Sequence, residues 1–200
     1  MDCLRHRIDD RGVHTDSDKM ACIHEWHMPR NHKDVQRFLG LVQYLAHFMP
    51  DITVYMSPIS AICQNGQLFY WKPLHEACFQ NIKAIACKSP ILKPINPTCV
   101  DLIWVICDAL TSGIRAMYGQ GENWQTCHLA GFMSKKFTSA QMNYHVFEME
   151  TIVILKALLK WEDKLLGRKL KIVTDHKVLE FFKTQRHLNS RQAWWMEFLA

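Results

Sequence analysis

The chain has 200 residues, and the 48% of them that are hydrophobic are enough for real cores, which excludes a disordered tail. Its 24 Lys and Arg residues against 19 Asp and Glu give a formal net charge of +5, which permits a polyanionic partner without requiring one. Eight Cys residues are scattered singly, without a C-x-x-C pair, and this favours a reduced intracellular protein over a disulfide scaffold. No apolar run is long enough for a membrane span, and the N-terminus carries charges where a signal peptide is apolar, so we expect a cytoplasmic or nuclear protein without a membrane partner.

The first 15 residues predict a short hairpin. Residues 4–15 read as two strands around the turn-forming stretch Asp9-Asp10-Arg11-Gly12. Paired aspartates also occur in polymerase active sites, but no strand of sufficient length precedes this pair, so we assign it to the turn. A little further on, Cys22, His24, His27 and His32 allow a small zinc site as an alternative, although the C-x-x-C half of a structural zinc site is missing.

Three helices are expected next. Asn31 is a candidate N-cap for a helix over residues 32–48, and Pro50 ends it. Its apolar residues recur at helical spacing and should form a buried stripe: Val35, Phe38, Leu39, Val42, Leu45 and Phe48. Further helices are predicted over residues 54–63, closed by Asn65-Gly66, and over residues 74–87.

A proline-rich connector over residues 89–97 should separate this helical part from a part in which strands and helices alternate. Strands are expected over residues 102–107, 114–118, 125–134 and 170–174, with short helices over residues 178–182 and from residue 190 onward. Asp108 follows the first of these strands and Asp175 follows the last. The order of elements predicts an α+β or α/β fold with a mixed sheet.

The stretch over residues 144–161 is the strongest helix signal of the chain, because it has no Gly or Pro and its apolar residues repeat at about 100° per residue. On a helical wheel Glu150 falls within the apolar face, whereas Glu148 falls on the polar face. A carboxylate inside a core is expensive unless a cation or a set of donors meets it. Glu150 therefore either pairs with a buried Arg or Lys or binds a metal ion.

Asp108, Glu150 and Asp175 together make a metal site the stronger alternative. We expect the two aspartates on neighbouring central strands, with Glu150 facing them from the helix. Ligands that are all oxygen suit Mg²⁺ or Mn²⁺ rather than zinc. Acids gathered around divalent ions are common in enzymes that displace groups at phosphate.

Several long motifs resemble one family. Asp108-Ala109 with Gly113, Ala116 and Gln120, then NYHVFEMET (143–151) and TDHKVLEFF (174–182), resembles the ribonuclease H domain of gypsy-type LTR-retrotransposon Pol polyproteins. Upstream, the stretches at residues 12–31, 34–52 and 69–94 are similar to the end of the polymerase palm, the thumb and the connection of the same polyproteins. The resemblance thus implies three parts: the end of the palm (1–30), a helical thumb and connection (31–97), and a ribonuclease H-like domain (98–200) that is incomplete at its C-terminus.

The resemblance also implies roles for the site. Asp108 would be the first catalytic carboxylate, bridging two Mg²⁺ or Mn²⁺ ions, and Glu150 and Asp175 would be the second and third. His176 and Arg191 would contact nucleic acid or help to position the site. The implied partners are an RNA–DNA hybrid and the rest of the Pol polyprotein, including the polymerase palm and the integrase, with no small-molecule cofactor.

Four residues depart from the family pattern: Leu110, Arg115, Ser17 and Trp194 stand where Ser, Gly, Pro and Arg are common. Arg115 places a long cation in the hairpin beside the site, where it either competes with a metal ion for Asp108 or points outward along its strand. A fourth catalytic Asp is expected beyond residue 200. We therefore expect an RNase H-type endonuclease with impaired activity, or alternatively a catalytically inactive module for nucleic-acid binding or assembly.

Overall fold

The structure is a computed structural model that describes residues 2–3, 6–9, 11–14, 17–63, 68–88, 91–110, 113–175 and 190–199. Its N-terminal strands form a small antiparallel sheet in the order β1-β2-β3: β1 (Asp2–Cys3), β2 (His6–Asp9) and β3 (Gly12–His14). Asp9 pairs with Gly12 across β2 and β3, and its carboxylate accepts a hydrogen bond from the Arg11 backbone N–H at 2.8 Å. The predicted hairpin is confirmed, with Asp9 at its turn; Asp10 lies outside the described residues.

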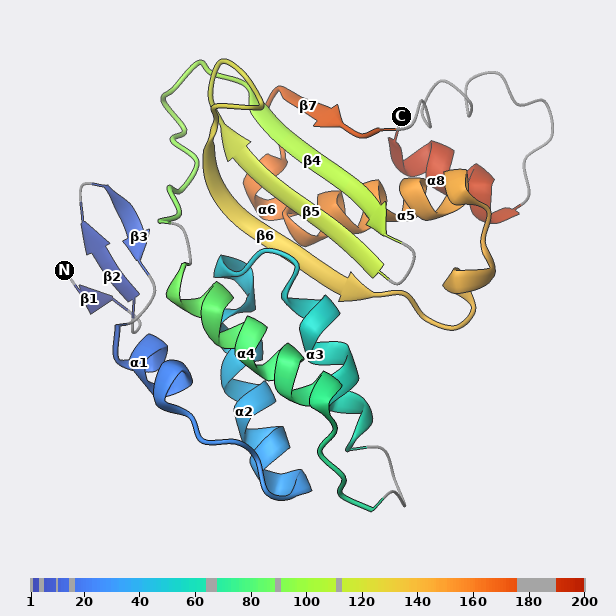
Figure 1. Ribbon diagram of the computed structural model, residues 1–200. Coiled ribbons are helices and arrows are strands. Elements are labelled where there is room, and N and C mark those ends of the chain that lie inside the picture. The colour runs from blue at the N-terminus through green and yellow to red at the C-terminus, as the bar shows by residue number, and fades with distance from the viewer. Residues whose placement is uncertain are drawn as a thin grey trace.

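A helical segment follows (Figure 1), and we use that name for residues 17–88. It contains α1 (Ser17–Glu25), α2 (His32–Leu45), the 3-10 helix η1 (Ala46–Phe48), α3 (Ile52–Ala61) and α4 (Pro73–Cys87). The Asn31 side chain accepts a hydrogen bond from the Asp34 backbone N–H at 2.9 Å, which confirms the predicted cap. Helix α1 was not predicted from the sequence. Asn65-Gly66 lies outside the described residues.

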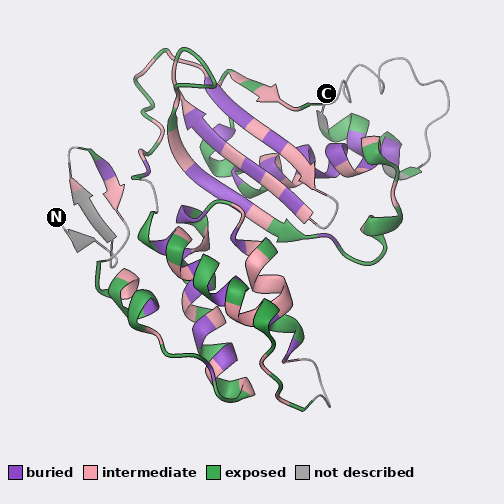
Figure 2. Cartoon of the chain, viewed as in Figure 1, coloured by how far each residue is buried: buried purple, intermediate pink, exposed green. Residues whose placement is uncertain are grey.

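The predicted stripe of α2 and η1 forms much of the core of the helical segment. Val35, Phe38, Val42, Leu45 and Phe48 are buried, as expected from their spacing, whereas Leu39 is only half-buried (Figure 2). The ring of Phe38 packs against that of Phe79 on α4, with centroids 4.7 Å apart. Burial of these large apolar side chains is the main force that holds the helices together.

The second part of the chain is built on a four-stranded mixed sheet of order β6-β5-β4-β7. Its strands are β4 (Ile103–Leu110), β5 (Gly113–Gln120), β6 (His128–Lys136) and β7 (Leu170–Val173). The helices of this part are η2 (Gln141–Asn143), α5 (Val146–Lys160), α6 (Glu162–Leu165) and α8 (Ser190–Leu199). Neighbouring strands pair antiparallel except β4 and β7, which are parallel. The short helix predicted at residues 178–182 lies outside the described residues.

Strand β4 is longer than the sequence predicted. Its pairing with β5 continues from Ile103–Gln120 to Leu110–Gly113, so Asp108 lies inside the strand and opposite Arg115 rather than after the strand end. Conversely, the third strand begins at His128, later than expected. The antiparallel hairpin supplies the backbone partners that keep residues 108–110 extended.

The helices α5 and α6 cover one face of this sheet (Figure 1). Alternate residues of β4 and β5 point into that layer, where they pack against α5: Ile103, Val105, Cys107, Ile114, Ala116 and Tyr118. The helical segment meets the sheet along β6, which contacts η1 and α3. Among the described residues, no helix is both long and apolar enough to cross a membrane.

The predicted connector links the two parts of the fold. Leu92 forms an isolated antiparallel bridge with Val13, and the Lys93 backbone N–H donates to the Leu129 carbonyl at 2.8 Å. Leu92 also packs in a small buried cluster with Phe48 and Phe132. These contacts join the N-terminal sheet, the helical segment and β6 at one junction.

Candidate metal centre

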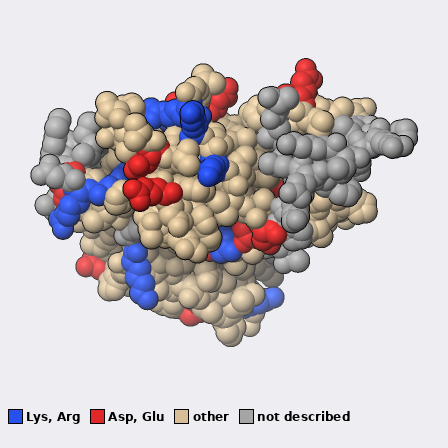
Figure 3. Space-filling model, turned by 90° about the horizontal axis from the view of Figure 1, so that it is seen from above, with Lys and Arg blue, Asp and Glu red and all other residues tan. Residues whose placement is uncertain are grey.

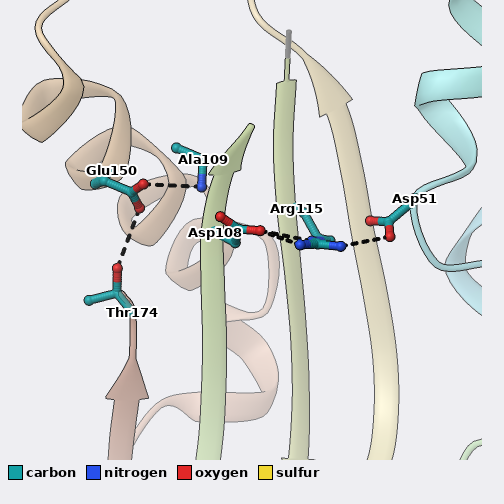
Figure 4. A network of polar contacts seen from close by, with 6 residues as sticks. All are labelled: Asp51, Asp108, Ala109, Arg115, Glu150 and Thr174. Carbon is teal, nitrogen blue, oxygen red and sulfur yellow. Dashed lines mark hydrogen bonds and ion pairs between the residues drawn. The ribbon is translucent and has the colours of Figure 1, made fainter. Parts of the chain in front are cut away.

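Glu150 is almost completely buried, with 1% of its surface exposed. Its carboxylate accepts one hydrogen bond from the Ala109 backbone N–H at 3.3 Å and another from the Thr174 hydroxyl at 3.4 Å. One donor lies on β4 and the other directly follows β7, so the carboxylate is fixed between these two neighbouring segments (Figure 4). The wheel prediction that Glu150 points inward is confirmed. Donors of this kind offset part of the cost of burying an ionised carboxylate.

The prediction for Glu148 is wrong. This residue is 4% exposed, although the wheel placed it on the polar face. It occupies the third position of α5, where its carboxylate accepts a hydrogen bond from the His145 backbone N–H at 3.3 Å, as in a capping box. It also accepts one from the Gln192 side chain of α8 at 3.2 Å. Helix α8 therefore covers a side that a wheel of α5 alone assigns to solvent.

Asp108, Glu150 and Asp175 come together as predicted, and we call them the acidic cluster. Each offers a carboxylate oxygen, and the three oxygens lie within 4.8 Å of one another. The parallel pairing of β4 with β7, in register at Ile106 and Val173, brings Asp175 to the same end of the sheet as Asp108. In the described part of the sheet, β7 is an edge strand, so the expectation of two central strands is wrong for Asp175.

The chemistry of the acidic cluster fits a hard divalent cation. It offers only carboxylate oxygens, the ligands that Mg²⁺ and Mn²⁺ prefer, and their spacing lets one ion contact all three residues. Within the described residues this is the only group of three or more His, Cys, Asp or Glu side chains that converges in this way. The side chains of the alternative zinc site, Cys22, His24, His27 and His32, are all described and do not converge in this way.

Arg115 holds one side of Asp108. Its Nε donates to the Asp108 Oδ2 at 3.1 Å, its Nη2 forms an ion pair with the same oxygen, and its Nη1 donates to the Asp51 Oδ2 at 2.9 Å. The hydrogen bonds to Asp108 and then to Asp51 raise the pKa of the Arg115 guanidinium, which is therefore a permanent cation. Sequence reasoning placed Arg115 beside Asp108 but missed Asp51, which is distant in sequence.

Burial raises the pKa of one titratable group next to the acidic cluster, the Cys107 thiol. Cys107, next to Asp108 in β4, points into the core, where desolvation and, to a lesser extent, the nearby Glu150 raise the pKa of its thiol to about 12. An uncharged thiol is a poor ligand for a hard cation and a poor nucleophile. Cys107 therefore belongs to the core and not to the site.

The acidic cluster opens onto a surface depression. Asp108 and Asp175 line it together with Arg115, Met117 and Trp124, an exposed aromatic residue of the β5–β6 loop that sequence reasoning did not single out. His176 lies outside the described residues. Arg191 lies in α8, but its side chain is also outside them. On the face seen in Figure 3, the described basic and acidic side chains are interspersed, so the net positive charge is not gathered in one patch there.

Comparisons with known proteins identify the family of the chain's second half. Residues 101–200 match the family described as "RNase H-like domain found in reverse transcriptase". The chain is 27% identical over 200 residues to the Transposon Tf2-3 and Tf2-4 polyproteins of Schizosaccharomyces pombe; the match covers 98% of this chain. The chain spans only 15% of the length of these curated relatives.

Solved structures give the same fold. The chain superimposes over its whole length on the foamy viral protease-reverse transcriptase in complex with an RNA/DNA hybrid, with a TM-score of 0.83 and 19% identity, covering 27% of that protein. For the same viral protein in complex with double-stranded DNA, the TM-score is 0.84 at 19% identity, with 42% of that chain covered. The family model matches half of the present chain, and the mixed sheet of that half carries the acidic cluster. The chain therefore belongs to the family of RNase H-like domains found in reverse transcriptases.

Proposed function

We propose that this chain is part of a retrotransposon reverse transcriptase in which the acidic cluster supports metal-dependent cleavage of the RNA strand of RNA–DNA hybrids. The observation that carries the proposal is the convergence of Asp108 on β4, Glu150 on α5 and Asp175 after β7, with carboxylate oxygens within 4.8 Å of one another. Family membership of residues 101–200 supports the same reaction class. The cleavage would serve RNA-directed DNA synthesis by the complete polyprotein.

A bound Mg²⁺ or Mn²⁺ would supply Lewis-acid stabilisation of the charge that develops on the phosphate oxygens. The protein's own part is to hold the ligands in place. Glu150 is oriented by the Ala109 N–H and the Thr174 hydroxyl, whereas Asp108 is held by Arg115. Glu150 is thus preorganised and needs little rearrangement when an ion binds, whereas an ion at Asp108 has to compete with Arg115. Trp124, exposed in the same depression, offers a flat apolar surface to a nucleotide base or sugar.

The wider assignment extends this proposal. We assign the chain to a gypsy-type Pol polyprotein, with residues 1–30 as the end of the palm, 31–97 as thumb and connection, and 98–200 as the RNase H-like domain. The curated relatives are transposon polyproteins, and the solved relatives hold an RNA/DNA hybrid or double-stranded DNA. Nucleic acid and the remaining polyprotein, including its polymerase palm and integrase, are therefore the proposed partners.

A second function is favoured by one specific contact. The Arg115 guanidinium is already paired with Asp108, the carboxylate that the resemblance places between two ions. A cation at this position opposes the binding of another cation. Cleavage would then be impaired, and in the limiting case the chain would act as an inactive module that binds nucleic acid or helps the polyprotein assemble.

The test is cleavage of a labelled RNA–DNA hybrid in Mg²⁺ and in Mn²⁺, by the chain alone and joined to the C-terminal segment of a related element. We expect cleavage, more of it with the added segment, and loss of at least about 100-fold in Glu150→Gln, because one ligand loses its charge. Glu148→Gln is the matched control, since Glu148 is buried on the same helix outside the acidic cluster. Hybrid binding without any metal-dependent cleavage, in every version, would support the inactive module instead.

A further inference from the structure

Arg115 lies between two carboxylates that belong to different parts of the fold. Asp108 is on β4 and belongs to the acidic cluster, while Asp51 precedes α3 in the helical segment. The guanidinium uses Nε and Nη2 for Asp108 and Nη1 for Asp51. Figure 4 shows the three side chains in a row, with the second oxygen of Asp108 on the side of Glu150. Asp108 and Asp51 therefore share one cation, the guanidinium of Arg115.

Asp51 is held in place for this contact. Its backbone is left-handed, with φ 54°, a conformation that Asp tolerates better than most residues but that still costs energy. Asp51 precedes α3 at its N-cap position, yet its side chain makes no capping hydrogen bond and pairs with Arg115 instead. Two residues later, Thr53 forms two hydrogen bonds with Ser134 of β6, the residue that pairs with Arg115 across β5 and β6. The start of α3 is thus fixed against the strand that lies beside Arg115.

Asp51 also has unused capacity to accept hydrogen bonds. Its Oδ1 is buried and, within the described part of the chain, has no hydrogen-bond partner. A guanidinium can donate two parallel hydrogen bonds to the two oxygens of one carboxylate, and this pairing is stronger than a single contact. The Arg115 guanidinium can therefore release Asp108 and donate to both oxygens of Asp51, which would give Oδ1 a hydrogen-bond partner.

We propose that Asp51 is a positioning residue that sets the affinity of the acidic cluster for a divalent cation, by offering Arg115 an alternative partner to Asp108. This inference rests on the proposed function, in which the acidic cluster binds such an ion. Arg115 and the ion compete for the negative charge of Asp108. Ion binding displaces the guanidinium from Asp108, and Asp51 keeps it paired. Without Asp51, displacement leaves a half-buried cation unpaired next to the ion, which is unfavourable.

The proposal predicts effects of opposite sign for two substitutions in the same row of side chains. Arg115→Gln removes the competing cation and should tighten Mn²⁺ binding by about tenfold or more, within the range usual for coupled sites. Asp51→Asn removes the alternative partner and should weaken Mn²⁺ binding by about fivefold. Asp51 acts only through Arg115, so adding Asp51→Asn to Arg115→Gln should change the affinity by less than about twofold.

The experiment is a Mn²⁺ titration of the full chain, with free Mn²⁺ followed by electron paramagnetic resonance. Thermal unfolding of each variant without metal verifies that it is folded. Asp163→Asn is the matched control, because it removes one negative charge from an exposed ion pair with Lys164 outside the row, and its affinity should equal that of the wild type.

Two results would overturn the inference. The first is that Asp51→Asn leaves the Mn²⁺ affinity unchanged. The second is that Asp51→Asn weakens Mn²⁺ binding by the same factor in the Arg115→Gln background as in the wild type. Either result would mean that Asp51 does not act through the guanidinium of Arg115. The proposed function survives that result as long as the wild type binds Mn²⁺ and Glu150→Gln does not. Failure of the wild type and of Arg115→Gln alike to bind Mn²⁺ would overturn the proposed function and this inference together.

Discussion

The carboxylate of Glu150 on α5 accepts a hydrogen bond from the backbone N–H of Ala109 on β4, the residue directly after Asp108. One side chain thus ties the helix to the strand at the point where the acidic cluster forms. Its second donor, the Thr174 hydroxyl, comes from the residue directly before Asp175. The groups that orient Glu150 are therefore the chain neighbours of the other two acids, so strand pairing and the position of α5 together set the geometry of the site.

The first prediction concerns the contact between α8 and α5. Gln192→Ala removes the side chain that donates to the buried Glu148, so it should lower the free energy of unfolding by about 1–3 kcal/mol. Glu197→Ala changes an exposed residue of the same helix and should stay within about 0.5 kcal/mol of the wild type. Urea unfolding measures both. Equal stabilities for the two variants would mean that α8 does not cover Glu148.

The second prediction concerns the core of the helical segment. Phe79 on α4 is buried against Phe38 and Trp71, so Phe79→Ala should cost about 3–5 kcal/mol through lost burial and the cavity left behind. Leu74, on the same helix, is 60% exposed, and Leu74→Ala should change stability by less than about 0.5 kcal/mol. Chemical denaturation of the two variants checks the difference. A small loss for Phe79→Ala would contradict the packing described for α4.

Two glycines should respond in opposite directions to substitution by alanine. A Cβ at Gly119, beside the irregular register of β5 and β6, would collide with the backbone carbonyl of His128, so Gly119→Ala should destabilise by at least about 1–3 kcal/mol. Gly40 lies inside α2 with open space around it, and Gly40→Ala should stabilise by about 0.5–1 kcal/mol. Melting temperatures report both signs. If both variants are less stable, the surroundings of Gly40 differ from those described.

The helical segment illustrates what the sequence could predict. The apolar spacing locates the buried face of α2, and the Asn31 cap and Pro50 locate its ends. The periodicity of residues 144–161 likewise predicts that the Glu150 side chain points into the core, as it does in the structure. Helix α1 was missed, since its nine residues bury only Ile23 and show no regular apolar stripe. A short helix of this kind depends on its contacts with α2 and α4.

The remaining differences come from contacts between segments far apart in the chain. Glu148 is buried because Gln192, 44 residues away, lies over it. The Asp51–Arg115 ion pair joins residues 64 positions apart, and no sequence pattern around either residue predicts the contact. Strand β4 extends past Cys107 because β5 supplies partners up to Gly113. Wheels and strand periodicities describe one element at a time, so they cannot include these effects.

Cysteine chemistry offers a fourth prediction. The pKa of the Cys107 thiol is raised to about 12, mainly by burial and secondly by Glu150, so at pH 8 almost no reactive thiolate is present. Native protein treated with iodoacetamide should therefore be modified at the exposed Cys22 and Cys87 long before Cys107. Peptide mass mapping over time gives the order, and urea-unfolded protein, in which all three react, is the control. Early labelling of Cys107 in the native protein would contradict its burial in the sheet.

The fifth prediction is the most direct test of the central claim that Asp108, Glu150 and Asp175 form one site for a divalent cation. It compares Mn²⁺ binding by the wild type, by Glu150→Gln and by Glu148→Gln, measured by equilibrium titration. Both glutamates are buried on α5 two residues apart, so the two variants lose the same charge from similar depths, yet only Glu150 belongs to the acidic cluster. We expect Glu150→Gln to weaken Mn²⁺ binding by at least about tenfold, because a hard cation loses an anionic ligand, and Glu148→Gln to bind as the wild type does. Equal loss in the two variants, or loss in Glu148→Gln alone, would contradict this assignment.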